Sequence, residues 1–210
     1  MTKPDYRRAI AQYIREQAKP PDKFSHQPRL YDLATQLAGG KAFDDAVLYA
    51  AAWMHDLGVF IGHRPEQPAA LARWDHLAYA LKNTPGFLRE CGFPVGKIPA
   101  VLEAIRTHMP AGQPVSFEAV LLRDADILEQ LGAVGILRTV SKVGRDTRFV
   151  RFSDALAALQ RNIESLPGQL KLPSARLLAQ PRLALLRDFL QAARAERAGV
   201  EFEAAPACLV

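Results

Sequence analysis

Apolar residues recur every three or four positions along most of this chain, a spacing that predicts α-helices. No segment shows the regular alternation of apolar and polar residues that is typical of a half-buried strand. Pairs of prolines and glycines, such as Pro20-Pro21 and Gly39-Gly40, mark expected helix ends. We therefore predict an all-α fold.

The expected helices each carry an apolar stripe between a capping residue and a breaking residue. In chain order they are Pro4–Gln17, a segment with Leu30 and Leu37 that stops at Gly39, about Asp44–Leu57, about Ala69 to a break at Pro85-Gly86, Ile98 to a stop at Met109-Pro110, Ser116–Leu131, Ser153–Ser165 and Ser174–Glu196. A chain of 210 residues can bury one substantial core, and no repeat or linker interrupts it. We expect a single helical domain over residues 1–197 and a flexible tail over residues 198–210.

Composition narrows the classes of protein to consider. The longest apolar run, Ala46 to Met54, is far shorter than the roughly 18 residues that a membrane span needs. With a charged N-terminus and only two cysteines, this favours a cytoplasmic protein. The net charge of +5 is compatible with a phosphorylated small molecule, with nucleic acid or with solubility alone. Nucleic acid is not expected, because no basic patch interleaved with aromatic residues is present. The densest basic stretch comprises Arg138, Lys142, Arg145, Arg148 and Arg151.

Three histidines lie on the apolar faces of expected helices. His55 follows the stripe of Val47 and Ala51, His26 precedes the stripe that contains Leu30, and His108 ends the stripe that begins at Ile98. A single inward histidine is more often a hydrogen-bonded core residue than a ligand. Several buried imidazoles and carboxylates, however, are costly without a common partner, and a shared cation would satisfy all of them. Such a mixed set suits Mn, Fe, Zn, Ni or Mg-like ions.

Two acidic positions complete the candidate set. Asp56 directly follows His55, and adjacent helical side chains diverge by about 100°, so one ion can bind both only close to the backbone. Asp124 and Asp126 lie two residues apart, on nearly opposite sides of their helix. Helical geometry does not choose between these two carboxylates. The one that does not bind is expected to be solvent-exposed or a hydrogen-bonding partner of a ligand.

The order of these residues resembles the HD superfamily of metal-dependent phosphohydrolases. The corresponding residues are His26 in FSHQPRLYDLA, His55-Asp56 in AAWMHDLG and Asp126 in ADIL, a context that favours Asp126 over Asp124. The resemblance implies an HD-type helical bundle in which these four side chains hold one divalent ion (Mn, Fe, Ni, Co, Zn or Mg), with a second ion left open. The segments DADILEQLGAVGILRTV and ARLLAQPRLALLRDFLQAARAE are similar to bacterial HD phosphohydrolases that act on small nucleotides.

The resemblance also implies roles outside the ligand set. In many HD hydrolases, histidines after the His-Asp pair hold a second metal or contact phosphate, and His76 and His108 match them. A purely structural role is an equal alternative for each. Arg29, one turn after the first ligand, and Arg145 in the basic stretch are candidates for binding substrate phosphate. His63 lies in a loop rich in glycine and proline and is expected to be solvent-exposed.

The resemblance, together with the positive net charge, implies a metal-dependent phosphohydrolase that cleaves phosphate or pyrophosphate from a nucleotide or another small phosphorylated substrate. A bound ion would lower the pKa of a water toward neutrality, and the metal-bound hydroxide would attack the phosphoryl group. One alternative is an HD-type hydratase for a small nitrile-like substrate, because Val59 replaces the lysine or glutamate of other family members. The other is a regulatory HD protein with little turnover, although all four ligand types are present.

Overall fold

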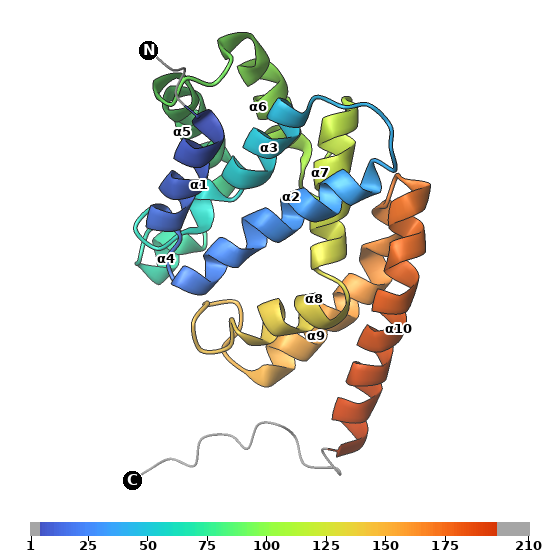
Figure 1. Ribbon diagram of the computed structural model, residues 1–210. Coiled ribbons are helices and arrows are strands. Elements are labelled where there is room, and N and C mark those ends of the chain that lie inside the picture. Colours follow the sequence, from blue (N-terminus) through green and yellow to red (C-terminus); the bar gives the residue numbers. More distant parts are fainter. Residues whose placement is uncertain (1–4, 197–210) are drawn as a thin grey trace. The chain divides into compact units, whose positions relative to one another are not determined.

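The computed structural model describes residues 5–196, which form helices joined by short loops (Figure 1). The α-helices are α1 (Tyr6–Gln17), α2 (His26–Leu37), α3 (Asp45–Met54), α4 (Pro68–Leu71), α5 (His76–Glu90), α6 (Ile98–Thr107), α7 (Phe117–Glu129), α8 (Gly132–Val140), α9 (Phe152–Ser165) and α10 (Pro173–Glu196). The 3-10 helices are η1 (Pro21–Ser25), η2 (Leu57–Val59), η3 (Val95–Lys97) and η4 (Pro167–Gln169). Within residues 5–196, the only β-structure is an isolated bridge between Ile61 and Arg64. The all-α prediction is confirmed.

Contacts between Cα atoms divide the chain into two compact units, Met1–Asp126 and Ile127–Val210. In the first unit, α3 packs against α1, α2 and α6, and α6 packs against α5 (Figure 1). Every residue of α3 from Val47 to Met54 is buried. A helix that is apolar all round can have neighbours on several sides, which suits α3 to the centre of this unit. The single domain over 1–197 stays a prediction, and the tail over 198–210 lies outside the described residues.

Aspartate side chains begin several of these helices. The carboxylates of Asp5, Asp44 and Asp75 accept backbone N–H groups in the first turns of α1, α3 and α5. The Asp44 carboxylate also pairs with Lys97 Nζ at 2.7 Å, and the Asp44 backbone N–H donates to Glu118 Oε1 at 2.6 Å. The start of α3 is therefore bonded both to the start of α6 and to the start of α7, so these caps fix the helix ends within the first unit.

The helix expected from Ala69 to Pro85 differs from the structure at both ends. The short α4 stops at Leu71, and α5 begins after Asp75, whose carboxylate accepts the Ala78 N–H at 2.9 Å. Pro85 lies inside α5, which continues to Glu90. The missing proline N–H removes one helical hydrogen bond, but buried side chains on both sides of Pro85 hold the helix in place.

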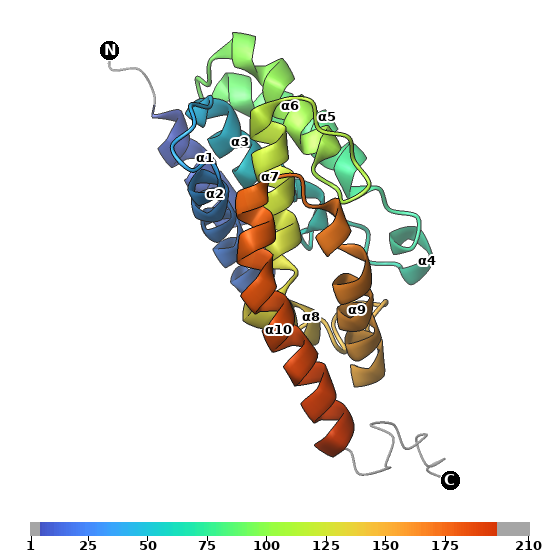
Figure 2. The same cartoon turned by 90° about the vertical axis from the view of Figure 1, so that its right-hand side faces the viewer.

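The second unit contains a helix that the apolar pattern did not predict. Gly132 begins α8 with a backbone φ of +69°, a conformation that favours glycine. This turn ends the preceding helical segment and starts a new one, and α8 packs against α9 and α10. Figure 2 shows α10 as one long continuous helix, although Pro181 lies within it. The continuity of α10 through Pro181 shows packing overriding a local helix-breaking residue.

Each helix in the described part of the chain is too short or too polar to cross a lipid bilayer. The cytoplasmic location stays a prediction.

Candidate metal centre

Four side chains from the ends of α2, α3 and α7 lie close together. His26 is the first residue of α2, His55 caps the C-terminus of α3, Asp56 follows it, and Asp126 lies on α7. The Nε2 atom of His26 lies 3.5 Å from Asp126 Oδ1 and 3.9 Å from Asp56 Oδ2. The Nε2 atom of His55 lies 3.6 Å from the same Asp56 oxygen. The structure thus brings together all four residues expected as metal ligands.

His55 and Asp56 are neighbours in the chain, yet their side chains converge. The backbone of His55 is helical (φ −58°, ψ −37°), whereas that of Asp56 (φ −98°, ψ 16°) has left the helix. The helix ends between them, so the divergence of adjacent helical side chains no longer applies. The change of backbone conformation at Asp56 therefore lets one ion reach both residues.

The ring of His55 is held in the orientation that a metal ligand needs. Its Nδ1 lies 3.0 Å from the Ala52 carbonyl oxygen, which only accepts hydrogen bonds, so Nδ1 carries the proton. Its Nε2 is buried and has no hydrogen-bond partner among the described residues. Burial lowers the pKa of His55, which favours the neutral ring with a lone pair on Nε2. An unpartnered imidazole nitrogen beside two carboxylates fits a divalent cation.

A second group of side chains shares Asp56. His108 caps α6, and its Nδ1 lies 2.6 Å from the Ile105 carbonyl oxygen, the same arrangement as at His55. Burial also lowers the pKa of His108. One ligand atom each from Asp56, His76 and His108 lies within 4.8 Å of the other two, as do atoms of His26, His55 and Asp56. Asp56 therefore belongs to both groups, and its two oxygens can serve both.

Asp124 lies beside Arg123, its neighbour in the chain. Its side chain is fully buried, and its Oδ1 lies 3.6 Å from the Nη1 atom of Arg123. The guanidinium of Arg123 also donates a hydrogen bond to the Pro110 carbonyl oxygen. Asp124 is therefore not solvent-exposed. The other carboxylate, Asp126, is the one beside His26.

The remaining candidates occupy different surroundings. Arg29 is partly buried in the first turn of α2, one turn after His26. Arg145 is exposed in the loop after α8, in the second unit, and its Nε donates to the Ser141 carbonyl oxygen at 2.7 Å. The structure therefore brings His76 and His108 to the cluster, and Arg145 lies in the second unit.

The prediction that His63 is solvent-exposed is wrong. His63 is partly buried, and its Nδ1 and Nε2 lie 2.7 Å from the Leu57 carbonyl oxygen and from Gln17 Oε1. Its ring also lies 5.2 Å from that of Tyr79. The loop is rich in glycine and proline but folds back onto α1 and α5, so its composition alone did not reveal this burial.

The turn that follows Asp56 is held by donors that sequence analysis did not identify. The three carbonyl oxygens of η2 (Leu57–Val59) accept, in chain order, from His63 Nδ1 at 2.7 Å, Trp74 Nε1 at 2.8 Å and Lys23 Nζ at 3.2 Å. Every carbonyl of η2 therefore has a side-chain partner from another part of the chain. No local sequence pattern marks such donors, since they lie up to 36 residues away.

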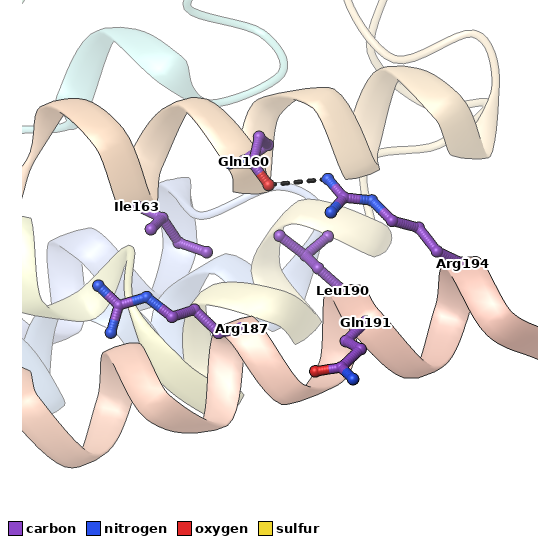
Figure 3. Close-up of a pocket in the computed structure, with 6 residues that line it drawn as sticks. All are labelled: Gln160, Ile163, Arg187, Leu190, Gln191 and Arg194. Atoms are coloured by element: carbon purple, nitrogen blue, oxygen red, sulfur yellow. Dashed lines mark hydrogen bonds between the residues drawn. The ribbon is translucent and has the colours of Figure 1, made fainter.

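A pocket of about 450 Å³ lies in the second unit, between α9 and α10 (Figure 3). It is lined by Gln160, Ile163, Arg187, Leu190, Gln191 and Arg194. Arg194 Nη2 donates to Gln160 Oε1 at 2.9 Å across it. Among the described residues, no histidine, cysteine or carboxylate lines this pocket, so these residues do not offer the donors of the metal centre.

Solved structures resemble the chain over most of its length. A protein described as a predicted HD superfamily hydrolase, from an uncultured Thermotogales bacterium, is 27% identical, with a TM-score of 0.62 over 90% of this chain and 91% of that one. An HD-superfamily hydrolase from Bacillus thuringiensis is 20% identical, with a TM-score of 0.66 over 92% and 97%. Bacillus subtilis YpgQ in complex with ADP is 19% identical, with a TM-score of 0.68 over 93% and 100%. No curated protein matches this chain in sequence.

The sequence profile described as HD domain matches residues 24–131, just over half of the chain. The matched segment contains His26, His55, Asp56 and Asp126, which are the residues that converge in the structure. The chain therefore belongs to the HD domain family, and its fold is shared with proteins described as HD superfamily hydrolases.

Proposed function

We propose that this protein is a metal-dependent phosphohydrolase that releases phosphate or pyrophosphate from a nucleotide or another small phosphorylated substrate. The observation that carries this proposal is the convergence of two imidazoles and two carboxylates, with the buried Nε2 of His55 turned toward Asp56. His26, His55, Asp56 and Asp126 would hold a divalent cation. When bound, such an ion supplies Lewis acidity and lowers the pKa of a water toward neutrality.

The chain's own residues contribute orientation and charge. The carbonyl oxygens of Ala52 and Ile105 keep the protons of His55 and His108 on Nδ1, so both Nε2 atoms stay available as acceptors. We assign His76 and His108, which lie beside Asp56, to the substrate phosphate or to a second cation. Arg29 on α2 and Arg145 after α8 are our candidates for neutralising phosphate charge.

Two observations support a nucleotide as the substrate. YpgQ, which shares this fold, has been solved in complex with ADP. The net charge of +5 also favours an anionic ligand over a neutral one, because it attracts phosphate from solution. The class of substrate is therefore a small phosphorylated molecule, with nucleoside di- and triphosphates as the first compounds to test.

Release of phosphate and pyrophosphate from a panel of nucleotides, with Mn²⁺, Mg²⁺, Ni²⁺ or Co²⁺, tests the proposal. We expect metal-dependent turnover that Asp56→Asn abolishes. The matched control is Asp32→Asn, which removes an exposed carboxylate on α2 and is expected to leave turnover unchanged. Turnover of cyanamide without phosphate release would replace the phosphohydrolase by a hydratase. Protein that binds metal but turns over neither class would favour a regulatory role.

A further inference from the structure

We propose that Gly58 and Trp74 are positioning residues that set the imidazole of His76 against Asp56 and His108. This inference rests on the proposed function for its consequence in catalysis. It adds two residues to the centre, neither of which offers a ligand atom. Both act at the junction between η2 and the start of α5, which pack together.

At this junction, position 58 has no room for a side chain, so it requires glycine. A Cβ atom on Gly58 would lie 2.3 Å from the carbonyl oxygen of His76 and 2.7 Å from its Cα, both far inside van der Waals contact. The obstacle is backbone, which cannot rotate away as a flexible side chain can. Any side chain at position 58 must therefore push the backbone of His76 away from η2.

Trp74 forms a hydrogen bond at the same junction. Trp74 lies two residues before His76 in the chain, and its Nε1 donates to the Gly58 carbonyl oxygen at 2.8 Å. Its indole ring lies 5.4 Å from the ring of Tyr79, one turn into α5. Asp75 caps α5 between them, so His76 is held as the first residue of that helix. The hydrogen bond and the close approach thus fix the same short piece of backbone.

These contacts bring together the side chains of Asp56 and His76, which are far apart in sequence. Asp56 lies two residues before Gly58, and the backbone of His76 lies against Gly58. The packing of η2 against the start of α5 therefore sets the distance between the side chains of Asp56 and His76. Their ligand atoms, together with one from His108, lie within 4.8 Å of one another. A displacement on the order of 1 Å at this contact would disturb the group, and such misplacements reduce catalysis strongly.

The test is a double-mutant cycle on ligand binding. Mn²⁺ affinity of metal-free protein is measured from the electron paramagnetic resonance signal of free Mn²⁺. Inorganic phosphate affinity of the Mn²⁺-loaded protein is measured by calorimetry. His76→Ala should weaken at least one of these affinities. For that affinity, Trp74→Phe should cause a loss of at least about threefold that disappears when His76→Ala is already present.

A spectroscopic measurement reports the position of the ring independently of activity. In protein labelled with ¹³C-histidine, the His76 imidazole signal is identified by its absence in His76→Ala. We expect this signal to move in Trp74→Phe and to stay in place in Tyr79→Phe. Tyr79→Phe is the matched control, because it keeps a ring beside Trp74 and leaves the bond to Gly58 in place. Gly58→Ala should reproduce Trp74→Phe with a larger effect, and Trp74→Phe carries the test if Gly58→Ala does not fold.

Two results would overturn the inference. In one, His76→Ala changes neither affinity. In the other, the losses caused by His76→Ala and Trp74→Phe simply add, so that Trp74 does not act through His76. Failure of the proposed function looks different, since Asp56→Asn would then leave Mn²⁺ binding intact or no phosphorylated compound would be hydrolysed.

Discussion

The Nε2 atom of His26 lies 3.5 Å from the Oδ1 atom of Asp126, so the first residue of α2 meets the last turn of α7. Two residues earlier on α7, Asp124 is fully buried and lies 3.6 Å from an Nη atom of Arg123. The two carboxylates are thus both buried but lie beside different side chains. This difference leads to separate expectations for their variants.

Asp126→Asn should weaken Mn²⁺ binding by more than about tenfold, because it removes a negative oxygen beside the Nε2 atom of His26. Asp124→Asn should leave Mn²⁺ affinity nearly unchanged and lower the free energy of unfolding by about 1–3 kcal/mol, because it removes the charge near the buried Arg123. Calorimetric titration with Mn²⁺ and urea unfolding of the metal-free proteins measure the two quantities. The reverse pattern would assign the ligand role to Asp124.

Metal binding should stabilise the folded protein. An ion that binds only the folded state adds about 2.7 kcal/mol to the free energy of unfolding when its concentration is 100 times its Kd. We therefore expect Mn²⁺ to raise the thermal midpoint, and EDTA to reverse the rise. Asp56→Asn should lose the rise, whereas Asp32→Asn, which alters an exposed carboxylate, should keep it. An equal rise in both variants would place the bound ion elsewhere.

The metal-free protein should lose stability as the pH falls below about 6.5. Burial lowers the pKa of His55 and of His108, so the unfolded chain takes up these protons before the folded protein does. The free energy of unfolding then rises with pH across this window and is fully restored above the unfolded pKa. Thermal unfolding in EDTA, followed between about pH 8 and about pH 5, measures the slope. His108→Gln should flatten it, and a slope unchanged by this variant would exclude His108 as a cause.

The start of α7 should depend on Ser116. Its Oγ accepts the Ala119 N–H at 3.2 Å and donates to Glu103 Oε2 at 2.7 Å, which ties α7 to α6. Ser116→Ala should lower the free energy of unfolding by about 1–2 kcal/mol, as expected for a lost helix cap. Urea unfolding measures the change. Ser165→Ala, which removes an exposed hydroxyl that donates to the Arg161 carbonyl oxygen, is the control and should have little effect.

Helical periodicity was sufficient for the fold class and for most helix ends. The bounds expected for the last two helices, Ser153–Ser165 and Ser174–Glu196, each lie within one residue of α9 and α10. Local signals failed where packing opposed them, since Pro85 lies inside α5 and α8 was not expected at all. A proline or glycine lowers the local stability of a helix, and packing against the surrounding core decides whether the helix still forms.

The sequence by itself determined which residues could form the centre. The inward faces of His26, His55 and His108 follow from helical spacing, and all three are buried in the structure. Only the tertiary structure decided that Asp126 and not Asp124 lies beside His26, and that His76 reaches Asp56 through the contact of its backbone with Gly58. Spacing specifies a side chain's direction on its own helix, whereas these distances depend on how separate helices pack, and that depends on the whole core of the first unit.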